Sequence, residues 1–329
     1  MGYSHWSNQA YTSRQAHRSA TNQTAFTHDQ QVREGLASGL HPQMDIAGKI
    51  RESRDSVEHP ESLAIAVIFD VTGSMGSVPR VLQTKLGALM RLLIQKGYVA
   101  HPQVLFGAVG DAYTDSVPLQ IGQFESGLEM DDELGKFYLE GGGGGQVHET
   151  YELGIYAMAY HTSVDCFEKR AKKGYLFTIG DEKPYDVVRA NHARDLLGDA
   201  LEKDIPLETV IAATLAKFEY FHIIPTNTYH GKDADVQKRW RDLLGERVLL
   251  LADENAVCET IGLAIGLCEG SVDDLYSGAA DLRQAGYNAN SITSAAQALG
   301  NFASQHASIV PVAKGTLPPV SGTGNDGRL

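Results

Sequence analysis

The chain has few cysteines, no long apolar run and no excess of basic residues. Its three cysteines, Cys166, Cys258 and Cys268, are far apart and form no CxxC pair. This spacing argues against a disulfide framework, so we expect buried free thiols in a reducing compartment. No apolar run approaches the roughly 20 residues that a membrane helix needs, and no signal-peptide apolar region opens the chain. The composition therefore predicts a soluble, cytoplasmic protein.

Basic residues are outnumbered, because 28 Lys and Arg stand against 41 Asp and Glu for a formal net charge of −13. Affinity for a nucleic-acid backbone is carried by Lys and Arg, so we do not expect a nucleic-acid partner. Residues 1–28 contain no acid and few aliphatic side chains. Such a segment forms no core of its own, and we expect an arm that orders only when it docks on a surface. The arm is also a candidate for contacts between copies of the chain.

A continuous apolar run, Leu63–Phe69, ends at Asp70 and is followed at alternate positions by Thr72 and Ser74. A run that is apolar on both faces is typical of a strand buried on both sides of a parallel sheet. Apolar residues at helical spacing over 78–93 predict that a helix follows. The carboxylate and the two hydroxyls therefore lie in a strand-to-helix loop, where open α/β sheets bind their ligands.

Further apolar runs alternate with helical patterns along the chain. Strands are predicted at 103–110, 119–124, 174–180, 220–225 and 248–251, and helices at 148–161, 186–197, 207–218, 233–244 and 256–267. This order predicts a doubly wound, mostly parallel six-stranded sheet with helices on both faces and 119–124 as an antiparallel edge. The expected divisions are a polar N-terminal arm with short helices (1–59), an α/β domain (60–270), a C-terminal helical extension (271–309) and a Pro/Gly-rich tail (310–329).

The loop Asp70-Val-Thr72-Gly-Ser74 resembles the D-x-[ST]-x-S metal-ion-dependent adhesion site (MIDAS) of von Willebrand factor A-like (VWA) domains. The resemblance covers about residues 60–270 and implies a VWA fold for them. It also implies that the two hydroxyls bind Mg²⁺ or Mn²⁺ directly, since these cations prefer oxygen ligands. A residue from a second loop and an Asp after the fourth strand, here Asp181, complete the sphere. One position stays open for an acidic residue of a partner protein.

The second loop departs from the family pattern. It contains five glycines, Gly141–Gly145, and continues to Glu149 and Thr150, where many family members have a Thr. Counting back from Gly154 puts Glu149 at the place of the metal residue, with Thr150 one position away as the alternative. The expected metal ligands are therefore Asp70, Thr72, Ser74, Glu149 and Asp181.

The resemblance implies a non-enzymatic adaptor or scaffold that captures an acidic residue of its partner through the bound cation. By analogy, a MoxR-type AAA+ ATPase is a candidate partner. Two alternatives stay open. The same loop also resembles the aspartyl-phosphate loop of haloacid-dehalogenase-like phosphotransferases, in which Asp70 is the nucleophile. The other alternative is a structural protein that self-assembles through its terminal arm.

Overall fold

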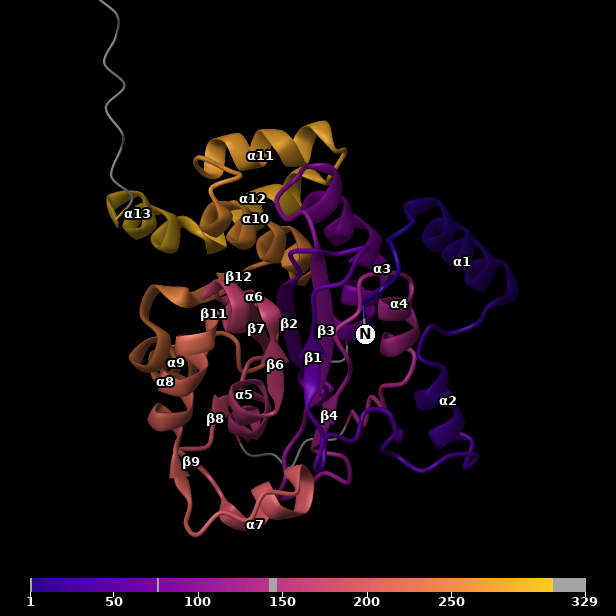
Figure 1. Ribbon diagram of the computed structural model, residues 1–329, viewed down its shortest axis with the longest axis vertical. Coiled ribbons are helices and arrows are strands. Elements are labelled where there is room, and N and C mark those ends of the chain that lie inside the picture. The colour runs from indigo at the N-terminus through magenta and orange to yellow at the C-terminus, as the bar shows by residue number, and fades with distance from the viewer. Residues whose placement is uncertain (1, 76, 142–146, 310–329) are drawn as a thin grey trace, which may run out of the picture.

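The computed structural model describes residues 2–75, 77–141 and 147–309, and its centre is a six-stranded sheet (Figure 1). The strands run in the order β12 (Val248–Leu251), β11 (Phe218–Pro225), β7 (Gly174–Ile179), β2 (Leu63–Asp70), β3 (Pro102–Val109) and β4 (Leu119–Ile121). Neighbouring strands are parallel, except that β4 pairs antiparallel with β3. The predicted α/β class, the mostly parallel sheet and the antiparallel edge are thus confirmed.

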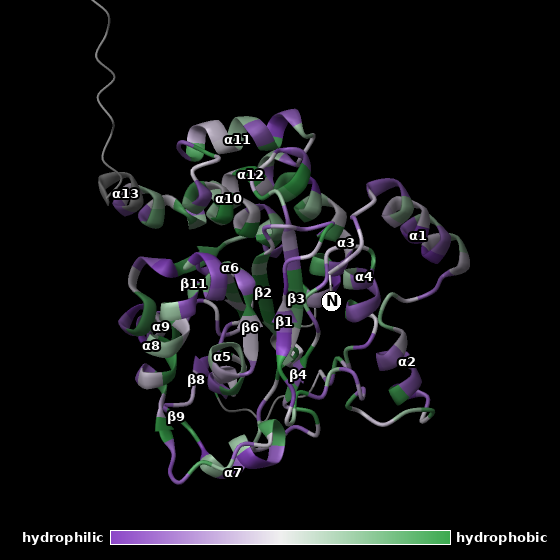
Figure 2. Ribbon diagram, in the orientation of Figure 1, coloured by the Kyte–Doolittle hydropathy of each residue, from purple (hydrophilic) through white to green (hydrophobic). Residues whose placement is uncertain are grey.

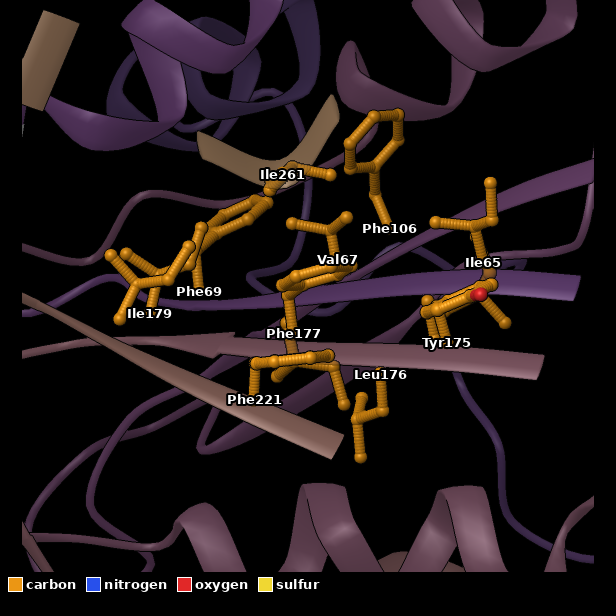
Figure 3. Packing of buried hydrophobic residues seen from close by; sticks show 14 of the residues in the cluster. Ile65, Val67, Phe69, Phe106, Tyr175, Leu176, Phe177, Ile179, Phe221 and Ile261 are labelled. Atoms are coloured by element: carbon orange, nitrogen blue, oxygen red, sulfur yellow. The ribbon is translucent and has the colours of Figure 1, made fainter. Parts of the chain in front are cut away.

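Helices cover both faces of this sheet. Those nearest to it are α3 (Val78–Met90), α5 (Tyr151–Tyr160), α8 (Leu207–Lys217), α9 (Ala234–Leu244) and α10 (Val257–Glu269). Figure 3 shows Val67 and Phe69 of β2 on the same side as Ile261 of α10. The intervening residue Ile68 instead lies against α5, where a Cβ on Gly154 would approach it to 3.4 Å. Because side chains alternate along a strand, α10 and α5 cover opposite faces.

Every residue of β2 is buried. A strand covered on both faces needs apolar side chains at odd and even positions alike, which explains its uninterrupted apolar run. Burial of each Val, Ile, Leu or Phe side chain stabilises the fold by about 1.5–3 kcal/mol. Charged and hydroxyl side chains are therefore placed at the end of the strand, beyond the helix layers.

Short strand pairs lie outside the central sheet. They are β1 (Arg51–Ser53) with β6 (Thr162–Val164), β5 (His148–Glu149) with β8 (Lys183–Pro184), and β9 (Val187–Val188) with β10 (Ile205–Pro206). At two of these pairs the structure differs from a predicted helix. The helix expected over 148–161 begins at Tyr151, because the two residues at its predicted start pair with β8. The helix expected over 186–197 is divided into β9, α7 (Ala190–His192) and the π-helical turn η3 (Ala193–Leu197).

The remaining short elements connect these layers. They are the turns η1 (Gly73–Met75), η2 (Arg91–Gln95), η4 (Gly245–Arg247) and η5 (Glu254–Ala256), with the helices α4 (Glu129–Leu134) and α6 (Asp165–Arg170). The turn η2 continues α3, so together they account for the helix predicted over 78–93.

The N-terminal arm forms α1 (Asn8–Thr21) and α2 (Thr27–Arg33) and packs on its own chain. Figure 2 shows α1 as a largely hydrophilic helix, and the residue that it buries is Tyr11. The Tyr11 hydroxyl donates to the carbonyl of Gln83 in α3. Arg18 Nη1 lies 2.8 Å from Asp131 of α4, a carboxylate that is fully buried. The arm, a candidate for contacts between copies of the chain, thus packs on its own domain in this structure.

The expected C-terminal helical extension forms three helices: α11 (Leu275–Gln284), α12 (Ala289–Ala298) and α13 (Gly300–Ile309). Phe302 of α13 lies edge-on to Phe221 of β11, with ring centroids 5.0 Å apart. The extension thus shares the core of the α/β domain. The expected tail, 310–329, lies outside the described residues. Within the described residues, no helix is both long and apolar enough to cross a membrane.

The buried ion pair of the arm gives a test of how α1 is held. Asp131→Asn removes the charge that Arg14 and Arg18 share, and we expect a loss of about 1–3 kcal/mol in the free energy of unfolding. Trypsin should then cut at Arg14 and Arg18 faster than in the wild type. Urea unfolding and timed proteolysis measure the two effects.

The matched control is Asp132→Asn. The side chain of Asp132 is half exposed, and it pairs with Arg14 at 2.6 Å but not with Arg18. An exposed pair contributes about 0–1 kcal/mol, so this variant should behave like the wild type. Equal losses in both variants would contradict the role given to Asp131.

Candidate functional site

Four carboxyl groups gather at the carboxyl edge of the central sheet. Asp70 ends β2, and Asp181 and Glu182 directly follow β7, the parallel neighbour of β2. Glu149 reaches the same edge from β5, whose partner β8 comes next after Glu182. All four side chains are buried. Parallel strands end at one edge, so residues more than 100 positions apart in the chain meet there.

Asp70 is held by three hydrogen bonds. Its Oδ1 accepts from the Thr72 backbone N–H at 2.7 Å and from the Thr72 hydroxyl at 2.5 Å. Its Oδ2 accepts from the Tyr151 hydroxyl at 3.0 Å. Burial, together with the charge of the nearby Asp181 carboxylate, raises the pKa of Asp70 to about 7 against the effect of these donors. The negative charge of this side chain is therefore poorly compensated by the protein itself.

The carboxyl groups of Glu149 and Glu182 lie close to each other and to Asp70. Burial, followed by the charge of Asp70, raises the pKa of Glu149 to about 11 and that of Glu182 to about 8. Within the described part of the chain, the Oε2 atom of each has no hydrogen-bond partner although both atoms are buried. Unpaired buried oxygens are costly, so these two atoms are candidates to bind a group from outside the protein chain.

Tyr151 reaches Asp70 because the neighbouring backbone leaves room for it. A Cβ at Gly180 would lie 1.7 Å from the Tyr151 hydroxyl, so only glycine permits this approach. The Tyr151 ring packs edge-on against His222 and Trp240, at centroid distances of 5.6 and 5.3 Å. Trp240 in turn donates its Nε1–H to the carbonyl of Glu182 at 2.8 Å. These aromatic rings fix the orientation of both Asp70 and the Glu182 backbone.

The remaining predicted residues are placed as follows. Asp181 is fully buried, and its Oδ2 accepts from the His230 backbone N–H at 3.0 Å. Thr150 faces the loop after β3, where its hydroxyl donates to the Gly110 carbonyl and accepts from the Ala112 N–H at 3.2 Å. Of the two candidate ligands in the second loop, Glu149 and Thr150, it is therefore Glu149 whose side chain lies close to Asp70. Ser74 belongs to η1, and its side chain lies outside what the structure describes, as do the glycines 142–145.

The donor chemistry of this edge fits a hard divalent cation, because it consists of carboxyl and hydroxyl oxygens. The Thr72 hydroxyl donates its proton to Asp70. No three His, Cys, Asp or Glu side chains among the described residues stand in position to hold a metal ion together. An ion at this edge would therefore need hydroxyl ligands as well, in keeping with the Thr and Ser of the loop.

Sequence reasoning did not assign two members of this cluster, Glu182 and Tyr151. Each directly follows an expected ligand or its alternative, Asp181 and Thr150 respectively. Their position next to an expected ligand was the only sign in the sequence that they belong to the site. It does not show that Glu182 lies beside Glu149 or that Tyr151 donates a hydrogen bond to Asp70. Both contacts depend on the β5–β8 pairing and on the space at Gly180.

No protein-family model and no curated protein matches this chain. Among solved structures, it is similar to the pilus adhesin SpaC from Lactobacillus rhamnosus GG in its open conformation, with a TM-score of 0.43 and 11% identity over 67% of this chain. It is also similar to proximal thread matrix protein 1 from the mussel byssus, with a TM-score of 0.41 and 11% identity over 62% of this chain. The chain spans 31% of the adhesin and 47% of the byssus protein.

The raised carboxyl pKa values predict how stability depends on pH in EDTA. The folded protein keeps protons on Glu149 and Glu182 that the unfolded chain releases above about pH 4.3, so the free energy of unfolding should fall as pH rises. For Glu182 the fall extends to about pH 8 and for Glu149 to about pH 11. Glu149→Gln mimics the protonated side chain, and we expect a flatter profile that exceeds the wild type at pH 8 by at least about 1 kcal/mol.

Urea unfolding at several pH values from 5 to 8 measures this profile. Asp242→Asn is the control, since that carboxylate is exposed on α9 and pairs with Lys238 one turn away. Parallel profiles for Glu149→Gln and the wild type would show that Glu149 ionises normally in the folded protein.

Proposed function

We propose that this chain is a VWA-like adaptor or scaffold that binds Mg²⁺ or Mn²⁺ at the carboxyl edge of its sheet. Through that ion it captures an acidic residue of a partner protein. The observation that carries the proposal is the convergence of Asp70, Glu149, Asp181 and Glu182. Two carboxylates about 4 Å apart repel each other by about 1–4 kcal/mol in water-like to surface-like surroundings. A divalent cation between the carboxylates converts this repulsion into attraction, which would explain why four acidic side chains lie together at this edge.

In this proposal the hydroxyls of Thr72 and Ser74 hold the ion. The carboxyl groups of Asp70, Glu149 and Asp181 complete its coordination sphere. Tyr151 keeps the Asp70 carboxylate in one orientation. The bound ion supplies the positive charge that an acidic partner residue needs. Without it, a protein with a net charge of −13 would repel such a residue.

The surface next to the site supports access by a protein. Gly73, between the two hydroxyl residues, is exposed. Tyr113 and Tyr229, on the loops after β3 and β11, are exposed by 50% and 86% respectively. Exposed tyrosines are common in protein interfaces because they bury a large area at low entropic cost. A cytoplasmic location and a AAA+ ATPase as the partner belong to this proposal by analogy only.

The environment of Asp70 favours binding over phosphoryl transfer. A nucleophilic aspartate must present a free oxygen to phosphorus. Both oxygens of Asp70 accept hydrogen bonds and the side chain is fully buried, so neither oxygen can approach a phosphorus atom in line, whereas an ion held by the hydroxyls of Thr72 and Ser74 needs Asp70 only as a nearby negative charge. The packing of α1 on its own chain likewise favours the adaptor over self-assembly through the arm.

Cation binding should be visible in thermal unfolding. Mg²⁺ at 100 times its dissociation constant should stabilise the folded protein by about 2.7 kcal/mol. The rise in Tm should be larger at pH 8 than at pH 6, because binding displaces protons from the raised carboxyl groups. Asp70→Asn should abolish the effect, whereas Asp242→Asn should keep it. An unchanged response in Asp70→Asn would refute the site.

Capture and catalysis can be separated with the same variant. Immobilised protein should retain a partner from its native host in Mg²⁺ and release it in EDTA, and Asp70→Asn should retain none. Added acetate should compete weakly with capture, as a free carboxylate would. Turnover of para-nitrophenyl phosphate that requires Mg²⁺ and is lost in Asp70→Asn would support the phosphotransferase instead.

A further inference from the structure

Three histidines from separate segments gather at the opposite edge of the sheet. His59 precedes β2, and His101 directly precedes β3, so both lie where these parallel strands begin. The His59 and His101 rings have centroids 5.6 Å apart, and their Nδ1 atoms are 3.4 Å apart. His5, from the segment that leads into α1, lies edge-on to His59 with a centroid distance of 5.0 Å. The carboxylate cluster at the other edge shares no residue with this group.

The hydrogen bonds of His59 define which nitrogen is available. Its Nε2 lies 2.8 Å from the carbonyl oxygen of Ser4, and a carbonyl can only accept, so Nε2 carries a proton. In neutral His59 the Nδ1 atom is then an acceptor, and Nδ1–H of His101 donates to it across 3.4 Å. A metal ion would replace this hydrogen bond once His101 carries its proton on Nε2. The ring of His59 is buried and held in place, whereas His101 is half-buried and His5 is exposed. The His59 side chain is thus fixed in position, whereas the side chains of His101 and His5 can change their orientation.

The spacing of the two nitrogens matches a shared metal ion. Zinc binds imidazole nitrogen at about 2.0–2.1 Å with tetrahedral geometry, which puts two ligand nitrogens about 3.3–3.4 Å apart. The second shell of imidazole ligands usually includes a backbone carbonyl that fixes the ring, as Ser4 does for His59. Negative charge is also near, since Glu58 lies within electrostatic range of His5 and His59, and Glu61 within range of His101.

We propose that His59 and His101 bind a transition-metal ion of the zinc class through their Nδ1 atoms, and that His5 turns in as a third ligand. The turn of His5 is required because no three described residues hold a metal as they stand. Nitrogen ligands select zinc, nickel or copper, whereas the oxygen cluster at the other edge suits magnesium. The ion would fasten the segment before α1 to the start of β2 and β3, and so would hold the arm against the domain.

The test is calorimetric titration of the full chain with Zn²⁺ at pH 7.5 in millimolar Mg²⁺, which leaves the oxygen site occupied by magnesium. We expect one tight equivalent in the wild type. His101→Gln should weaken it by at least about tenfold, since loss of a ligand exceeds the effect of a second-shell change. His5→Ala should weaken it severalfold. Thermal unfolding in EDTA should show that each variant is folded.

His41→Gln is the matched control. His41 and His28 also form an edge-on pair, with centroids 4.9 Å apart, but Nδ1 of His41 accepts from the Gln43 backbone N–H at 3.2 Å and so faces no second imidazole. This variant should bind Zn²⁺ like the wild type. Equal affinity in His101→Gln and the wild type would overturn the site and leave a hydrogen-bonded histidine pair. Equal affinity in His5→Ala would overturn the third ligand.

A second readout tests the consequence for the arm. Zn²⁺ should slow tryptic cleavage at Arg14 and Arg18 in the wild type and in His41→Gln, but not in His101→Gln. Binding without any protection of the arm would overturn the fastening role.

Discussion

The burial of β2 between two layers of helices is the constraint on which the rest of the structure depends. Because both faces of the strand are covered, its polar residues are confined to the point where it leaves the sheet. Its parallel neighbours β3 and β7 are also buried along their whole length, and an aspartate follows each within two residues, Asp111 and Asp181 respectively. Parallel alignment then brings the ends of all three strands to one edge. The acid cluster is thus a consequence of how the core is built.

The cluster is unfavourable for a protein alone. Asp70, Glu149 and Glu182 are buried close together, and burial with mutual repulsion raises the pKa of each. Structural acids are normally paired with Lys or Arg, as Asp131 is with Arg18 at the arm. Asp131 is thus compensated within the fold, whereas the acids at the sheet edge are not, and this contrast is the basis of the proposed cation site.

Much of the fold could be predicted because its elements have local signals. The strand at Leu63–Phe69, the antiparallel edge at 119–124 and the helix over 207–218 each follow from the spacing of apolar residues within the segment. The start of α5 could not be predicted in this way. His148 and Glu149 fit a helical pattern but pair with Lys183 and Pro184, more than 30 residues away, and such pairing leaves no trace in either segment.

For the candidate site, local pattern alone specified the loop of Asp70, Thr72 and Ser74 and its position after a buried strand. It also indicated Asp181, since an acid directly follows another apolar run. Long-range packing specified that Glu149 meets Glu182, that Tyr151 bonds Asp70 across Gly180, and that the polar arm docks on its own chain. The physical reason is range: backbone preference and hydrophobic periodicity act over a few neighbouring residues, whereas hydrogen bonds and charges depend on distances that exist only after the chain has folded.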